Sequence, residues 1–238
     1  MESTVPGWFG KIPSLGDFAH RRLPNQFTSH WDDWLQHSIK SSQSVLGNQW
    51  MEAYLTAPIW RFVLLPGIIN HQAWTGLIMP SVDKVGRYFP LTVAIPIDDC
   101  ANLLSNMASI GEWHKLIEQV MLSTLDTNFS HEQFDANLFN HPLPNLLTSE
   151  DTIPGLGTTL DFLAEPWNSY HTDLSSWEEL RGLCYKSGQL YLKGKLQDVS
   201  LWWTSMTLQN NIECCWFRGM PPQEAFTKFL QKVLVVNY

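Results

Sequence analysis

Apolar residues recur every three or four positions between residues 26 and 45, which predicts a helix with one buried face. Pro24 and Asn25 mark the start of this helix, and Gly47 marks its end. The same spacing recurs from about residue 111 and again after Pro221-Pro222. Between them, Ser130 is a residue type that caps helix N-termini. Further helices are therefore predicted at 49–55, at 111–127, from Ser130 onward, at 177–185 and from Pro221-Pro222 onward.

Elsewhere the pattern changes to alternation with a period of two, which is typical of half-buried strands. The clearest case is Trp60 to Leu65, which Pro66-Gly67 closes. Pro90 and Pro96 bound another such run. The connections between the middle strands are too short for crossover helices, so we expect antiparallel neighbours. The predicted strands are 8–12, 60–65, 74–79, 91–95, 190–192, 200–205 and 212–217.

The order of these elements predicts an α+β sandwich, a mainly antiparallel central sheet with helices covering its faces. Residues 141–176 are rich in Pro, Gly, Ser and Thr, and we interpret them as a long irregular excursion. No internal repeat and no clean linker divides the chain, so residues 1–238 are expected to form a single domain.

Charge and composition exclude some classes of binding partner. The net charge is −8, and no basic run is longer than Arg21-Arg22, so nucleic acid is not an expected partner and an anionic membrane is disfavoured. There is no apolar N-terminal signal and no window of eighteen apolar residues, so we expect a cytoplasmic protein without membrane insertion. The twelve Trp and twelve Phe can fill a core, and such residues also enrich protein–protein contacts.

Familiar catalytic signatures are missing. Gly10-Lys11 resembles the end of a phosphate-binding loop, but Val5 stands where its first glycine belongs, and Ile12 replaces the metal-binding hydroxyl. No G-x-S-x-G, H-E-x-x-H or C-x-x-C occurs, so we expect no metal, no cofactor and no enzyme activity. Cys214 and Cys215 lie next to each other in a predicted strand and are interpreted as small buried hydrophobes.

Two short segments concentrate the charged residues that stand out. The first contains Lys11, Asp17 and Arg22, and the second contains Ser81, Asp83 and Arg87. Arginine can bind a carboxylate through two hydrogen bonds, so such residues either hold loops together or form a binding site. Both interpretations stay open on the sequence.

The motifs in these segments resemble those of a known family. They are GWFGKIPSLGDF with RRLP, W-x-x-WL, WRF, MPSVDKVGRYFPL, SLWW and RGMPPQEAF. Together they resemble the TagF (ImpM) family of accessory proteins of bacterial type VI secretion systems. The main motifs fall within residues 5–97, and 186–238 supply C-terminal strands and a helix. The matching positions are Gly10, Lys11, Pro13, Gly16, Asp17, Phe18, Arg22, Trp34, Trp60, Pro80, Ser81, Asp83, Gly86, Arg87, Pro90, Ser200, Trp202 and Trp203.

The resemblance implies a three-layer α/β sandwich and a cytoplasmic, post-translational negative regulator of secretion. The implied partner is the forkhead-associated-domain scaffold protein of the same system, and any PP2C-type phosphatase would be a separate protein. On the motif positions, we expect Asp17 and Asp83 to share Lys11, Arg22 and Arg87, in a cluster walled by Trp202 or Trp203.

Two alternatives stay open beside the regulator. One is a sensor or enzyme for a small anion or nucleotide, using Asp17, Asp83 and Arg87. The other is a structural subunit of the secretion apparatus.

Overall fold

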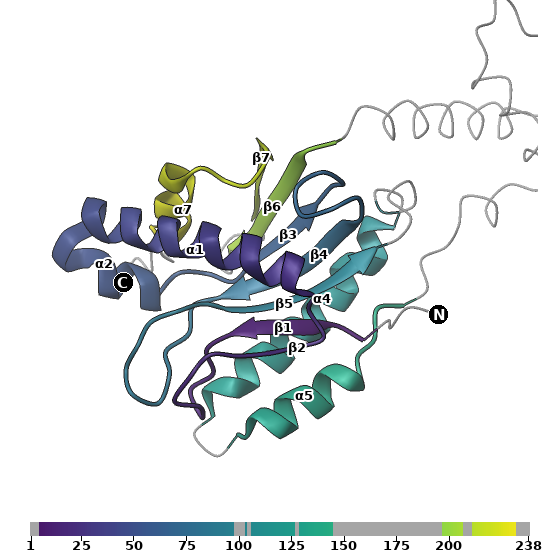
Figure 1. Cartoon of the computed structure of the whole chain (residues 1–238), viewed down its shortest axis with the longest axis horizontal. Helices are drawn as coiled ribbons and strands as arrows, with labels where there is room; N and C mark the ends of the chain where they lie inside the picture. The colour runs from purple at the N-terminus through teal and green to yellow at the C-terminus, as the bar shows by residue number, and fades with distance from the viewer. Residues whose placement is uncertain are drawn as a thin grey trace, which may run out of the picture.

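A seven-stranded antiparallel sheet organises the computed structural model, which describes residues 5–97, 103, 106–126, 129–144, 197–206 and 211–231. The strand order is β2-β1-β5-β4-β3-β6-β7, with every neighbouring pair antiparallel (Figure 1). The predicted α+β class with a mainly antiparallel sheet is thus confirmed. The strands are β1 (Gly7–Gly10), β2 (Ala19–Arg21), β3 (Trp60–Leu64), β4 (Ala73–Met79), β5 (Leu91–Ile97), β6 (Val199–Met206) and β7 (Asn211–Arg218).

Two strand predictions differ from the structure. The three-residue strand β2 was not predicted. It is short and none of its side chains is buried, so the sequence shows no alternation of buried and exposed positions there. Strand β5 continues through Pro96, which was expected to end it. Strand β1 pairs only with Thr92–Ala94, so Pro96 has a strand neighbour on one side, and a proline is tolerated there.

The helices fall where they were predicted, although the one predicted at 111–127 is α-helical over Met107–Leu122. Gly47, with a φ of 52°, ends the first helix. The predicted cap at Ser130 is a capping box, in which the Ser130 hydroxyl and the Gln133 side chain each accept a backbone N–H of the other residue. The helices are α1 (Asn25–Leu46), η1 (Gly47–Gln49), α2 (Trp50–Leu55), α4 (Met107–Leu122), η2 (Ser123–Leu125), α5 (His131–Phe139) and α7 (Gln223–Leu230).

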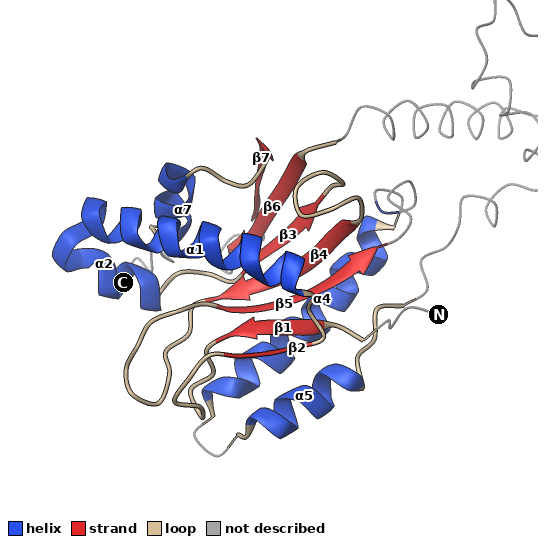
Figure 2. Cartoon of the chain, viewed as in Figure 1, coloured by secondary structure: helices blue, strands red, loops and turns tan. Residues whose placement is uncertain are grey.

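Helices cover both faces of the sheet, which gives the expected three layers. Figure 2 shows α1, α2 and α7 on one side and α4 and α5 on the other. The first side buries an aromatic core that includes Trp31, Phe62 and Trp202. The second side buries a core in which Trp8 from β1 packs edge-on against Phe134 from α5. The strand period of two sends alternate side chains into these two separate cores.

Some predictions lie outside the described residues. They are the excursion 141–176 beyond residue 144, the helix 177–185 and the strand 190–192. The prediction that Cys214 is buried is wrong, because it lies exposed on β7, the outermost strand at that end of the described sheet, while Cys215 is half-buried. No helix in the described ranges is long and apolar enough to cross a membrane.

Candidate functional site

The turn after β1 and the loop between β4 and β5 meet through a buried ion pair. Lys11 Nζ lies 2.8 Å from Asp83 Oδ2, and both side chains are almost inaccessible to solvent. Arg87 donates a second hydrogen bond to the same oxygen, at 2.7 Å from its Nε. The backbone N–H groups of Val85 and Arg87 donate to the other carboxylate oxygen, at 3.1 and 2.8 Å. The Asp83 carboxylate therefore has four hydrogen bonds, two of them from cations.

Electrostatics follows from this geometry. Burial alone raises the pKa of a carboxyl group, but the hydrogen bonds from Lys11 and Arg87 outweigh it. They hold the pKa of Asp83 well below its ordinary value, so the group is ionised at neutral pH. We call Lys11, Asp83 and Arg87 the charged staple, because the ion pairs fasten two loops that are 72 residues apart in sequence.

Backbone contacts reinforce the same junction. The Lys84 N–H donates to the Leu15 carbonyl at 2.9 Å, and the Arg87 guanidinium donates to the Gly16 carbonyl. Gly10 has a φ of 131°, and a Cβ there would lie 2.1 Å from the Pro90 carbonyl oxygen. Only glycine allows the two segments to approach so closely. The predicted meeting of these two motif segments is confirmed.

The staple differs from the predicted cluster at its edge. Asp17 is 87% exposed and reaches only the outer side of Arg87, at 3.9 Å. It therefore contributes little to the buried junction. The guanidinium of Arg87 is itself half exposed, so the staple has one solvent-facing cation.

Arg22 was expected in this cluster, and that prediction is wrong. Its guanidinium instead binds Asp135 of α5, at 2.5 and 3.1 Å, and its Nε donates to the Pro6 carbonyl at 2.9 Å. Trp8 donates to the same carboxylate at 2.9 Å. Although burial opposes ionisation, these hydrogen bonds lower the pKa of Asp135. Arg22 thus fastens α5 to the sheet, on the face opposite α1.

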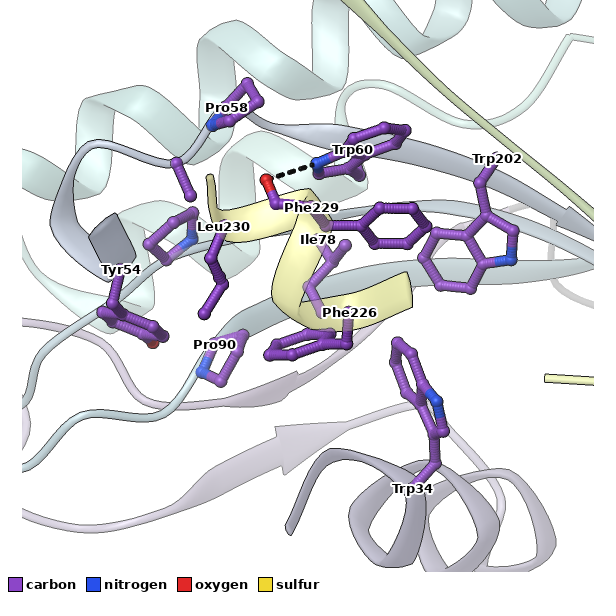
Figure 3. A pocket seen from close by; sticks show the side chains of 12 residues that line it. Trp34, Tyr54, Pro58, Trp60, Ile78, Pro90, Trp202, Phe226, Phe229 and Leu230 are labelled. Atoms are coloured by element: carbon purple, nitrogen blue, oxygen red, sulfur yellow. Dashed lines mark hydrogen bonds between the residues drawn. The ribbon is translucent and has the colours of Figure 1, made fainter. Parts of the chain in front are cut away.

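Either Trp202 or Trp203 was expected to wall the cluster, and this prediction is also wrong, because neither ring lies there. Trp202 lies in a closed aromatic pocket under α7, with Trp34, Phe226 and Phe229 around it (Figure 3). The space left there is about 20 Å³, room for about one water molecule. Trp203 points to the opposite face, where the centre of its ring lies 5.3 Å from the centre of the His114 ring. Alternation along β6 sends the two rings to different cores.

Ser81 lies next to the staple and is tied to α2. The Tyr54 hydroxyl accepts the Ser81 N–H at 3.1 Å and donates to the Ser81 carbonyl at 3.0 Å. Burial raises the pKa of Tyr54, which keeps this hydroxyl a neutral donor. The Ser81 hydroxyl is buried and has no hydrogen-bond partner in the described part of the chain.

An open groove of about 450 Å³ borders the staple on the side of Ser81. The motif residues Pro13, Pro80 and Ser81 form one wall. Leu55 and Leu125 line it as well, and they are 52% and 56% exposed. The staple fixes the loops that form this wall, so the groove keeps its shape without a ligand. We call this the motif groove.

The sequence did not indicate the leucines of the motif groove. Leu125 continues the apolar spacing of the predicted helix 111–127 and was expected to be buried. The α-helix ends at Leu122, and the following 3₁₀ turn points Leu125 into the open groove. The change of helix type, which periodicity does not report, redirects this side chain.

A second polar cluster lies under α4. Arg61 forms an ion pair with Glu118, and His114, one turn earlier on α4, is fully buried beside them. Thr75 Oγ1 donates to the Phe62 carbonyl at 2.9 Å, so its 3.0 Å contact with His114 Nε2 requires Nε2 to carry the proton. Burial, and then the charge of Arg61, lowers the pKa of His114 to about 3.

In each cluster the charged groups of the described residues are paired with one another, and Arg87 is the most exposed of them. Asp83 has no exposed side-chain surface, and its cations are engaged. In the ranges that the structure describes, no group of three His, Cys, Asp or Glu side chains could hold a metal ion. The feature that borders the staple is the motif groove, which is lined mainly by apolar side chains.

Comparison with known proteins identifies the family. A family model described as the TagF N-terminal domain, type VI secretion system-associated, matches residues 7–140. This chain belongs to the TagF family. A crystal structure of PA0076 from Pseudomonas aeruginosa PAO1 resembles it with a TM-score of 0.70 and 31% sequence identity, over 94% of this chain and 93% of that one. No curated protein matches.

Family membership makes this chain a type VI secretion-associated protein. The matched range 7–140 contains both loops of the staple and all the leucines of the motif groove. The last two strands and α7 lie beyond it, and they complete the sheet through the pairing of β6 with β3.

Proposed function

We propose that this protein is a non-enzymatic, cytoplasmic regulator that restrains a bacterial type VI secretion system after translation. It acts by binding the forkhead-associated-domain scaffold protein of that system. Membership of the type VI secretion-associated TagF family supports the choice of system. The observation that carries the binding role is the motif groove, an open apolar hollow whose wall is made by family motif residues.

The groove has the properties of an anchor for a protein partner. It is about 450 Å³ in volume, which is enough for one or two large side chains. Binding energy at protein interfaces concentrates in a few apolar anchors that fill such hollows. The staple and the Tyr54–Ser81 hydrogen bonds hold the wall in place, so little conformational entropy is lost on binding.

The two alternative functions receive less support. A sensor or enzyme built on Asp17, Asp83 and Arg87 would need all three to act on one ligand, but Asp83 is buried with four hydrogen bonds, which leaves only Asp17 and Arg87 exposed. No observation favours a structural subunit of the apparatus. A PP2C-type phosphatase fits the proposal as a separate protein acting on the same system.

The test is calorimetric titration of the full chain with the scaffold protein. Leu125→Glu places a charge in the groove, and we expect binding to weaken about tenfold or more. Phe139→Glu is the matched control, because Phe139 is also an exposed apolar residue at a helix end but does not line the groove. We expect this variant to bind like the wild type.

A secretion assay tests the direction of regulation. A strain that lacks the protein should secrete more effector, and the wild-type chain or Phe139→Glu should restore repression while Leu125→Glu should not. If the wild-type chain does not bind the scaffold, the proposed partner is wrong. If Leu125→Glu binds and represses normally, the groove is not the binding surface.

A further inference from the structure

A second hollow lies on the other side of the turn that follows β1. This cleft, between α1 and the β1–β2 hairpin, has a volume of about 300 Å³. Phe9 and Phe18 form its apolar wall, and Phe18 is 48% exposed. Side chains of α1 form the opposite wall, among them Asp32 and Gln36. We call it the Asp32 cleft.

Asp32 is a carboxylate without a counter-ion. It is half-buried, and it accepts a hydrogen bond of 2.6 Å from the Gln36 side-chain amide. In the described part of the chain, no Lys or Arg side chain forms an ion pair with it. Burial, with a smaller contribution from neighbouring Asp33, raises the pKa of Asp32 despite the Gln36 hydrogen bond. A partly desolvated negative charge of this kind is stabilised by a cation that enters the cleft.

The basic residues of the chain near the cleft are engaged elsewhere. Lys11 is held by Asp83, and its Nζ lies 4.8 Å from the centre of the Phe18 ring. Arg21 and Arg22 bind Asp135 on the opposite face of the sheet. His20 is the other titratable side chain that lines the cleft. Among the described residues near the cleft, no Lys or Arg is left to pair with Asp32, and we look to another molecule for the cation.

We propose that the Asp32 cleft binds the guanidinium group of an arginine side chain of a partner protein. A guanidinium has five N–H donors in a planar fork, and the cleft offers several acceptors on one helix face. These are the Asp32 carboxylate and the hydroxyl oxygens of Ser29 and Thr28. Thr28 uses its own proton toward the carbonyls of Pro24 and Asn25, which leaves its lone pairs for a donor.

The apolar wall selects arginine over lysine. A guanidinium is weakly hydrated and packs its flat faces against aromatic side chains, whereas an ammonium keeps its water. Phe9 and Phe18 line the same cleft as Asp32, so an arginine side chain that reaches Asp32 also contacts this apolar wall. This inference does not depend on the scaffold protein or on the motif groove, and it can fail while the proposed function stands.

The test is an NMR titration of the full chain, labelled with ¹⁵N, at pH 8. The probe is N-acetyl-arginine N-methylamide, which presents arginine as it occurs within a protein. We expect saturable shifts confined to residues 8–10, 17–21 and 28–36, with a dissociation constant on the order of 1 mM for a single side chain. N-acetyl-lysine N-methylamide should bind several-fold more weakly.

Two matched variants locate the site. Asp32→Asn keeps the shape of the side chain and removes its charge, and we expect affinity for the arginine probe to fall about tenfold. Asp33→Asn makes the same charge change at the neighbouring exposed position, which does not line the cleft, and should lower affinity much less than Asp32→Asn, through the weaker long-range charge effect alone. If Asp32→Asn proves unstable in its melting curve, Phe18→Leu provides a second test, with an expected loss of several-fold.

Four results would overturn the proposal. They are no saturable shift in the wild type, equal affinity of Asp32→Asn, and a lysine probe that binds as tightly as the arginine probe. The fourth is tighter binding of free arginine than of the capped probe, which would identify the ligand as a small molecule rather than a protein side chain.

Discussion

The buried His114 makes the stability of the protein depend on pH in a way that can be calculated. In the folded protein its pKa is lowered from 6.5 to about 3, mainly by burial and then by Arg61. Protonation would place a proton on Nδ1, which is buried and has no hydrogen-bond partner among the described residues. The folded state therefore keeps the imidazole neutral over most of the acid range.

The sign of the effect follows from proton linkage. Above pH 6.5 both the folded and the unfolded states have a neutral His114, so the group contributes no pH dependence. Below pH 6.5 the unfolded state takes up a proton that the folded state refuses, and stability falls until the pH reaches the folded pKa of about 3. At pH 5.0 the loss relative to pH 7.5 is about 2 kcal/mol, from 1.36 kcal/mol per pH unit below the unfolded pKa.

The assay is urea unfolding of the wild type and of His114→Gln at pH 7.5 and pH 5.0. The glutamine amide can donate to Thr75 Oγ1 as the imidazole does, but it does not titrate. Other ionisable groups change equally in both proteins, so the difference between the two pH-dependent losses isolates His114. We expect the wild type to lose about 2 kcal/mol more than the variant over this range. Equal losses in the two proteins would show that His114 is not held neutral.

Three further predictions concern the architecture around the motifs. Gly10→Ala should destabilise the protein by about 3 kcal/mol or more in urea unfolding, because the new Cβ would overlap the Pro90 carbonyl and because Gly10 has a φ of 131°. Gly16→Ala is the control: Gly16 has open space around it, so the change in stability should be less than about 1 kcal/mol. Phe229→Ala should cost about 3–5 kcal/mol, because Phe229 is buried in the closed pocket around Trp202, and a loss below about 1 kcal/mol would mean that α7 contributes little to the fold. Asp83→Asn should lower the melting temperature clearly and Asp17→Asn should not, since Asp83 is buried and holds both Lys11 and Arg87, whereas Asp17 is exposed and reaches only Arg87. Equal effects would refute the distinction between a buried staple and an exposed ion pair.

Much of the fold could be predicted from the sequence because its elements have strong local patterns. The helix at Asn25–Leu46 and the strand at Trp60–Leu64 lie within a residue or two of their predicted ranges. The predictions that failed concern side chains whose placement depends on tertiary structure rather than on local pattern. Trp202 and Trp203 are adjacent letters, and only the pairing of β6 with β3 decides which ring enters which core.

The candidate site divides in the same way. The motif positions that the family resemblance supplied, together with their opposite charges, led to the prediction that Lys11, Asp83 and Arg87 meet. Arg22 was misplaced, because the carboxylate that binds it, Asp135, lies 113 residues away in a helix whose position depends on the whole sheet. The motif groove could not be predicted either, since Leu125 has the same character as the buried leucines of its helix until the geometry of the turn is known.

The pairing of β6 with β3 also has a consequence for how the protein is made. Every side chain of β3 is buried in the finished fold, and its second neighbour in the sheet begins at Val199. At about 5–20 residues per second, a ribosome needs roughly 7–30 s to pass from Leu64 to Val199. During that time one edge of an apolar strand has no partner from β6, and such edges invite pairing with other chains. The nascent protein is therefore most vulnerable to aggregation late in its own synthesis, and chaperone dependence should be greatest for chains that stall before β6 emerges.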